Sequence, residues 1–293
     1  MTTPLTEETI PDTTKLLLEA LDDRWRNYRM ELKRCRAEFS NEAVHNLRVA
    51  TRRMLALIQL LNSISPRPRL RKLMRAFKDQ LDEFDNLRDT QVILDEVSKL
   101  IHELPQLNDF QKHLQFAEEK LLRKLRKEIK QLESSEISKR IRKTHVAIEA
   151  ETNNDLSSQL MQVVDDVYLI TQQRLGWVDL TRSATIHRMR IAFKALRYMI
   201  EIVHPLLNDF PIENLKRMNG YQSLMGEIQD AEVFAQKLAD FSEHASFVDL
   251  EPARRYCERR HAVAISAYVA EQNQLATFWR SAPEQPFPWE KTA

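Results

Sequence analysis

Glycine is nearly absent from this chain: only Gly176, Gly220 and Gly226 occur in 293 residues. The phosphate-binding loops of nucleotide-binding folds need clustered glycines, and the tight turns of strand-rich folds favour glycine as well. Both classes are therefore excluded. The abundance of Leu, Ala, Glu, Lys, Arg and Gln favours helix instead, so the sequence predicts an all-α protein.

The two cysteines, Cys35 and Cys257, are too far apart in the sequence to form a metal-ligand motif. No apolar run approaches the roughly 18–20 residues that span a bilayer, and no apolar secretory segment begins the chain. We therefore expect free thiols, a cytoplasmic location, no membrane association, and neither a metal nor another cofactor.

Basic residues are unevenly distributed although the net charge is only +1. The segment from Ala43 to Lys78 holds nine Lys or Arg and no carboxylate, and the segment from Thr181 to Ile200 holds five and none. In a chain whose charges otherwise nearly cancel, such segments predict surfaces that attract anions.

These two basic segments also resemble each other. Residues 44–52, VHNLRVATR, match residues 186–194, IHRMRIAFK, at an offset of 142. Downstream, LRD at 87–89 matches IQD at 228–230, and upstream, LDD at 21–23 matches VDD at 164–166. Three matches in the same order predict the duplication of a unit of about 140 residues.

The duplication divides the chain into halves at 12–150 and 151–281, with a polar linker at 151–155 and a loose C-terminal tail at 282–293. Apolar periodicity predicts about four helices in each half. The first half has ranges 13–39, 41–63, 67–104 (with a break near Asp89) and 108–150. The second half has ranges 156–175, 183–203, 212–242 and 251–281. Two pseudo-symmetric four-helix bundles are the natural packing.

Each copy of the repeated helix carries a stripe of basic side chains, because residues three and four apart share one face. The stripes consist of His45, Arg48 and Arg52 in the first half, and of His187, Arg190, Lys194 and Arg197 in the second. Both stripes border the apolar face of the helix, which predicts that they line a groove or the interface between the halves.

Like charges at these spacings repel, and the two acid-free segments contain no carboxylate to offset the repulsion. A repeated row of cations suggests a polyanionic ligand, since Arg and Lys bind phosphate oxygens. The alternative is that these cations pair with carboxylates of neighbouring helices, such as Asp89, Asp230 or the pair Asp22 and Asp23.

The repeated pattern His-x-x-Arg-x-x-x-Arg/Lys, followed each time by an Arg-Asp-like motif, resembles the CHAD domain family over about residues 12–280. The resemblance implies two related helical bundles around a basic pore, binding of inorganic polyphosphate, and association with polyphosphate granules. Many relatives carry an attached triphosphate-tunnel domain, whose Glu-x-Glu-x-Lys signature is absent from this sequence. We therefore expect no catalysis.

Carried over by position, the resemblance implies a polyphosphate site with the following residues: His45, Arg48, Arg52, Arg53, Arg75, Lys78, Arg88, His187, Arg190, Lys194, Arg197 and Lys216. The sequence departs from the family pattern at three places. Asp85 stands where glycine is common, Asn219 stands at the position that matches Lys78, and Leu55 matches Arg197. Lys216 is the substitute that we expect for Asn219.

Two other functions remain as alternatives: binding of nucleic acid, chiefly RNA, and a phosphate-metabolising enzyme or regulator that uses the same basic residues. The aromatic residues do not alternate with basic ones as base-stacking platforms would. A second stripe, Arg123, Arg126, Lys127 and Lys130, is interpreted as a solvated helix face. The sequence does not determine the oligomeric state.

Overall fold

The computed structural model describes residues 12–131, 134–150, 155–245 and 248–290, and the regular structure within these ranges is entirely helical. The first five α-helices are α1 (Thr13–Glu38), α2 (Asn41–Ile64), α3 (Pro68–Leu100), α4 (Asn108–Gln131) and α5 (Ser134–Glu149). The next four are α6 (Leu156–Gly176), α7 (Ser183–Val203), α8 (Glu213–Ser242) and α9 (Glu251–Glu271). Short 3₁₀ segments lie at Pro105–Leu107, His204–Leu206 and Gln272–Thr277.

Local chemistry explains where the first helices begin. The carboxylate of Asp12 accepts hydrogen bonds from the backbone amides of Thr14 and Lys15, and the hydroxyl of Ser40 caps α2 in the same way. These side chains satisfy amide groups that have no partner within the helix. Pro68 begins α3, where its missing N–H costs nothing.

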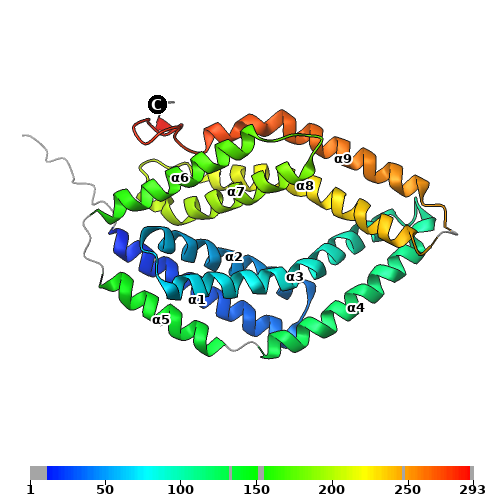
Figure 1. Ribbon diagram of the computed structural model, residues 1–293, viewed down its shortest axis with the longest axis horizontal. Coiled ribbons are helices and arrows are strands. Elements are labelled where there is room, and N and C mark those ends of the chain that lie inside the picture. Colours follow the sequence, from blue (N-terminus) through cyan, green and yellow to red (C-terminus); the bar gives the residue numbers. More distant parts are fainter. Residues whose placement is uncertain (1–11, 132–133, 151–154, 246–247, 291–293) are drawn as a thin grey trace, which may run out of the picture.

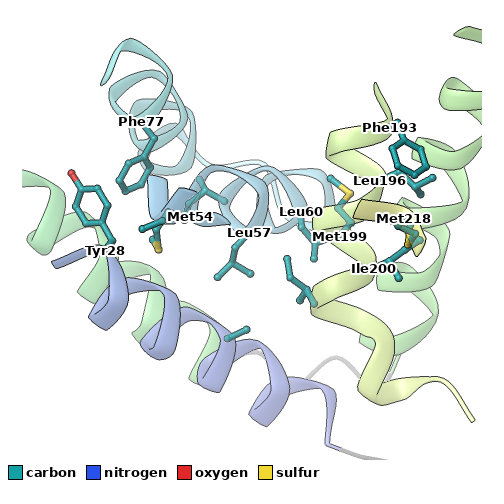
Figure 2. Close-up of a cluster of buried hydrophobic side chains, with 14 of the residues drawn as sticks. Tyr28, Met54, Leu57, Leu60, Phe77, Phe193, Leu196, Met199, Ile200 and Met218 are labelled. Carbon is teal, nitrogen blue, oxygen red and sulfur yellow. The ribbon is translucent and has the colours of Figure 1, made fainter. Parts of the chain in front are cut away.

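The helices form two groups that lie side by side. In the first group α2 packs on α1 and α3, α5 packs on α1 and α3, and α4 packs on α3. In the second group α6 packs on α7, α7 on α8, and α8 on α9. The groups meet where α2 contacts α6 and α7 and where α3 contacts α8 (Figure 1). Figure 2 shows this junction: Leu60 of α2 lies beside Met199 of α7 in one continuous apolar cluster.

A second, smaller apolar cluster lies at the far end of the molecule. It joins the second half of α3 and the start of α4 to the second half of α8 and the start of α9. The ring of Phe110 is stacked on Phe234 and tilted against Phe241. Between the two clusters, α3 and α8 carry polar residues, among them Asp89, Gln91 and Asp230. The apolar core is therefore interrupted by a polar layer where α3 and α8 come together.

Two helix predictions in the first half differ from the structure. The expected break near Asp89 does not occur, and α3 is continuous to Leu100. The single helix expected over 108–150 is instead two helices, α4 and α5, on either side of 132–133, which lie outside the described residues. Ser134 and Glu136 are residue types favoured in a first helical turn, a signal hidden by the apolar periodicity that continues across them. Residues 151–154 of the expected linker also lie outside the described residues.

The C-terminal prediction also needs correction. Helix α9 ends at Glu271, ten residues earlier than expected, and continues as a 3₁₀ segment to Thr277. The expected loose tail is packed over the described residues 282–290: the rings of Phe287 and Trp289 are stacked, and Phe287 contacts the buried Trp279. The indole N–H of Trp289 donates to the Asn208 carbonyl oxygen at 3.2 Å. The aromatic residues of this segment anchor it.

Candidate anion-binding site

Four cations from two contacting helices form what we call the central basic cluster: Arg48 and Arg52 of α2, and Arg190 and Lys194 of α7. Their proximity is evident in their electrostatics, because Arg48, Arg52 and Arg190 all disfavour the charge on Lys194. Both helices bury the adjacent apolar face, which draws the neighbouring basic stripe toward the interior. The structure thus brings together cations that the sequence separates by about 140 residues.

Arg48 is almost completely buried, with 5% of its side chain exposed. Its Nη2 donates a hydrogen bond of 2.7 Å to Oδ1 of Asp85 on α3. Its Nη1 is also buried, but has no hydrogen-bond partner among the described residues. One half of this guanidinium is therefore satisfied and the other half is not, which is costly for a buried charged donor.

Arg190 occupies the matching position on α7, but its guanidinium has no carboxylate within ion-pair distance among the described residues. It lies over Gly226 of α8, where a Cβ atom would be 3.8 Å from Nη2. Its Nε is buried without a hydrogen-bond partner in the same part of the chain. Burial lowers the pKa of Arg190, and the more distant Asp230 and Asp89 only partly oppose this effect.

Burial and neighbouring cations also lower the pKa of the other two members of the cluster. The pKa of Lys194 falls to about 6, first because of burial and then because of Arg52 and Arg190. The pKa of Arg52 is lowered by burial and then by Arg48. At neutral pH without a ligand, Lys194 is therefore mostly an uncharged amine. Asp85, which bonds to Arg48, offsets these effects only in part.

The two histidines of the repeated motif lie at the exposed edge of this cluster. His45 is exposed at its ring edge, and its pKa is lowered by partial burial and then by Arg88 and Arg52. His187 is exposed too, with Nδ1 2.5 Å from the amide oxygen of Gln229 on α8. Arg88, half-buried on α3, also acts on Asp230 across the junction. His45, His187 and Arg88 thus add further N–H donors beside the cluster.

Two further carboxylates lie near the cluster, Asp89 of α3 and Asp230 of α8. Burial raises the pKa of both Asp89 and Asp230, and Arg48 and Arg190 partly reverse the effect at Asp89. Neither carboxylate forms an ion pair within 4 Å among the described residues. The alternative in which Asp89 or Asp230 directly neutralises the basic stripes therefore does not describe the structure; Asp85 is the paired carboxylate.

Arg197, the last member of the second stripe, has a different environment. It is only 8% exposed, donates to Glu201 at 2.6 Å and to Gln222 at 3.0 Å, and lies over the ring of Tyr198. The expectation of an unopposed row of cations on this helix is wrong here, because Glu201 lies one turn away at the i,i+4 position just beyond the acid-free segment. Arg197 therefore has a carboxylate and an amide partner within the fold.

A second basic region, which we call the outer cavity, lies beside this ion pair. It has a volume of about 550 Å³, and its charged lining consists of three cations, Arg24 of α1, Arg53 of α2 and Lys216 of α8, and two carboxylates, Asp23 of α1 and Glu201 of α7. Arg53 is 3.5 Å from Glu201, which it shares with Arg197. Burial lowers the pKa of Arg24, and its Nε has no hydrogen-bond partner among the described residues.

The structure places the twelve expected site residues unequally. Arg75 and Lys78 are exposed on α3 and belong to neither the central basic cluster nor the outer cavity. Lys78 lies two turns before Asp85, on the same side of the helix. The solvated helix face expected from the sequence is also exposed: Arg123, Arg126, Lys127 and Lys130 all lie on the solvent side of α4.

Sequence reasoning missed two residues of this region. Arg24 was overlooked because acidic residues precede it in the sequence and its helix carries no repeated basic motif. Asp85 was noted only as a departure from a pattern, and its contact with Arg48 depends on the register between α2 and α3. One sequence signal indicated that this part of α1 belongs to the repeated unit: the match between residues 21–23, next to Arg24, and residues 164–166.

Among the described residues, no group of three or more His, Cys, Asp or Glu side chains could hold a metal ion. Within the same ranges, no helix combines the length and the apolar character needed to cross a bilayer.

Helical architecture and a cation cluster at the junction of two helix groups define an all-α protein with a partly buried basic centre. The CHAD domain family model matches residues 19–239, and the chain therefore belongs to the CHAD domain family. The fold is similar to the crystal structure of the CHAD domain from the plant Ricinus communis, with a TM-score of 0.65. The match covers 94% of this chain and 93% of the other at 15% sequence identity. The comparison with curated proteins gives no match.

Proposed function

We propose that this protein binds inorganic polyphosphate through the central basic cluster and does not act on it chemically. The observation that carries this proposal is that Arg48 and Arg190 each keep a buried guanidinium nitrogen without a hydrogen-bond partner among the described residues. Buried charged donors are normally satisfied, and in this proposal an external acceptor supplies the missing hydrogen bonds. Phosphate oxygens suit this role, because a guanidinium can donate two parallel bonds to one phosphate.

The site belongs to two related halves, at 12–150 and 151–281, that arose by duplication. In this proposal Arg48 corresponds to Arg190 and Arg52 to Lys194, and a pseudo-two-fold axis passes between α2 and α7. The contact between these helices supports this arrangement. The two stripes then line a single basic groove or pore, and a bound polyanion neutralises both at once.

A chain of phosphates fits the arrangement better than a single small anion. The central basic cluster and the outer cavity both lie where the two helix groups meet, and each contains a buried guanidinium nitrogen without a partner, on Arg48, Arg190 or Arg24. One compact anion can contact only one of these regions. A polymer with a charge on every unit can contact both, and the exposed Lys78 on α3 would extend the same path.

The surroundings of the cluster favour polyphosphate over nucleic acid. Single-stranded nucleic acid is normally held by exposed aromatic rings on which bases stack. The aromatic residue next to these cations, Tyr198, is buried and covered by Arg197. We accordingly propose an RNA-independent role for the protein in the cytoplasm, at polyphosphate granules.

A competition experiment tests this function. Immobilised polyphosphate should retain the protein, and free polyphosphate should release it at concentrations, counted in phosphate units, at which RNA and DNA do not. Binding should weaken steeply with salt, by roughly a thousandfold for a fourfold rise if about six phosphates are contacted. Equal displacement by RNA would replace this function with nucleic-acid binding. Release of inorganic phosphate from the polymer would contradict the absence of catalysis.

A further inference from the structure

Asp85 contacts the central basic cluster directly, and its position has a counterpart in the second half that lacks a carboxylate. At the repeat offset of 141, Asp85 on α3 corresponds to Gly226 on α8. The Arg48 guanidinium bonds to the Asp85 carboxylate at 2.7 Å, whereas the Arg190 guanidinium lies over Gly226. Asp85 also lies close enough to influence Arg52, Arg190 and Lys194.

We propose that Asp85 is an internal counter-anion, which occupies Arg48 in the ligand-free protein and is displaced when a polyanion binds. This inference rests on the proposed function, since it assigns a residue that sets the affinity of that same site. In it, the Asp85 carboxylate stands in for one phosphate of the ligand, and its negative charge opposes binding at all four cations.

The exposure of the two partners shows that the contact can be exchanged. Arg48 is 5% exposed and fixed within the fold, whereas Asp85 is 53% exposed. The carboxylate can therefore rotate into solvent and be hydrated, at little cost to packing. It satisfies only Nη2 and leaves the buried Nη1 without a partner. A phosphate that reaches Arg48 can accept from both nitrogens, which makes it a better partner than Asp85.

The test is the affinity of Asp85→Asn for polyphosphate of defined length. The substitution keeps the shape of the side chain and removes the competing charge. We expect roughly tenfold tighter binding at low salt, the size of one charge-assisted hydrogen bond, together with a steeper dependence on salt. The ligand-free variant should melt at a lower temperature, because Arg48 loses its internal partner.

Two controls separate a local exchange from a general change in charge. Asp79→Asn removes an equal charge from an exposed position on α3 and should tighten binding by less than twofold. In an Arg48→Gln background, Asp85→Asn should show only this small gain, because the direct contact no longer exists; this is a double-mutant cycle. Asp85→Ser gives an independent check on folding and should reproduce the gain of Asp85→Asn.

The outcomes distinguish the two proposals. If wild type binds polyphosphate but Asp85→Asn binds equally or more weakly, Asp85 is a structural partner of Arg48 and the inference is wrong. If Asp85→Asn keeps its full gain in the Arg48→Gln background, the gain does not arise from the contact with Arg48 and the inference is wrong as well. If the gain of Asp85→Asn equals that of Asp79→Asn, the effect is non-specific charge and the inference is also wrong. If wild type does not bind polyphosphate at all, the proposed function itself fails.

Discussion

The two basic helices differ most at their matched arginines. Arg48 of α2 is half-neutralised by Asp85, while Arg190 of α7 has no carboxylate within ion-pair distance among the described residues and lies over Gly226. The same type of side chain, at the same position of a repeated motif, thus has a carboxylate on the neighbouring helix in one case and a bare backbone in the other. The ligand-free state of the site is therefore asymmetric, although its sequence motif is repeated.

The second difference concerns the residue one turn further along. Arg52 keeps a delocalised charge when partly buried, but Lys194 at the matching position has a pKa of about 6. The second helix therefore offers an unpaired arginine and an amine that is mostly neutral at pH 7. The first helix offers two charged arginines, one of which is already paired. Pairing with Asp85 therefore reduces the attraction of α2 for anions. Loss of the proton from Lys194 reduces that of α7.

The largest expected effect concerns the two arginines. Arg190→Gln should weaken polyphosphate binding by roughly 30-fold, because it removes a charged donor whose energy is not spent on an internal partner. Arg48→Gln should weaken binding less, by roughly threefold to fivefold. In wild type the phosphate contact of Arg48 forms only after the contact with Asp85 is broken, so its net contribution to the binding free energy is smaller. Titration calorimetry of both variants measures the difference. Equal losses would mean that the asymmetry has no energetic consequence.

Gly226→Asp introduces into the second half the carboxylate that the first half has. We expect roughly tenfold weaker binding, since Arg190 would gain an internal competitor. Gly226→Ala is the matched control: its Cβ would be in ordinary contact with Arg190, 3.8 Å away. Alanine should leave binding unchanged and raise the free energy of unfolding by about 0.5–1 kcal/mol, as glycine-to-alanine changes do within helices. Weaker binding by Gly226→Ala would show that space, and not charge, matters here.

A smaller effect is expected from the pH dependence of Lys194. Its pKa is lowered from 10.5 to about 6 in the ligand-free protein, so between these values the unfolded chain binds more protons and folding stability rises with pH. A bound polyanion favours the charged amine, so binding takes up a proton and the affinity falls as pH rises above about 6. Affinity should drop several-fold between pH 5.5 and 8.

Lys194→Arg is the control for that pH dependence, because arginine stays charged throughout this range. His45 and the end groups of the polymer contribute equally to the pH dependence of wild type and variant. Once this shared contribution is subtracted, the variant should bind at pH 8 about as well as at pH 5.5. An unchanged profile in the variant would assign the pH dependence to those other groups.

Much of the fold could be predicted from the sequence because it depends on local and periodic signals. The scarcity of glycine and the 3.6-residue periodicity predicted the all-α class, and the repeated motif identified the family. The positions of Arg48, Arg52, Arg190 and Lys194 around their helices predicted that they border the buried face. In the structure these four side chains lie close together where α2 contacts α7. These properties depend on spacing along one helix, which the sequence states directly.

The pairing of charges could not be predicted in the same way. The carboxylate that pairs with Arg48 is determined by the register between α2 and α3. In this register Asp85, and not Asp89, lies within hydrogen-bond distance of Arg48. The ion pair between Arg197 and Glu201 is a different case. Its i,i+4 spacing is visible in the sequence, so this pair could have been predicted. The packing of Phe287 and Trp289 against the fold was missed because proline-rich spacing suggested a loose tail, whereas the aromatic rings determine the outcome.

The central claim is that polyphosphate binds at the junction of α2 and α7, and the most direct measurement compares two quadruple variants. One replaces Arg48, Arg52, Arg190 and Lys194 by Gln, and the other replaces the solvent-exposed Arg123, Arg126, Lys127 and Lys130. Both remove four basic side chains. We predict that the first abolishes polyphosphate binding while the ligand-free protein stays folded, and that the second retains most of the wild-type affinity. Equal losses would contradict the claim and leave only non-specific attraction to basic surfaces. Unfolding of the first variant would show instead that these four residues hold the helices together.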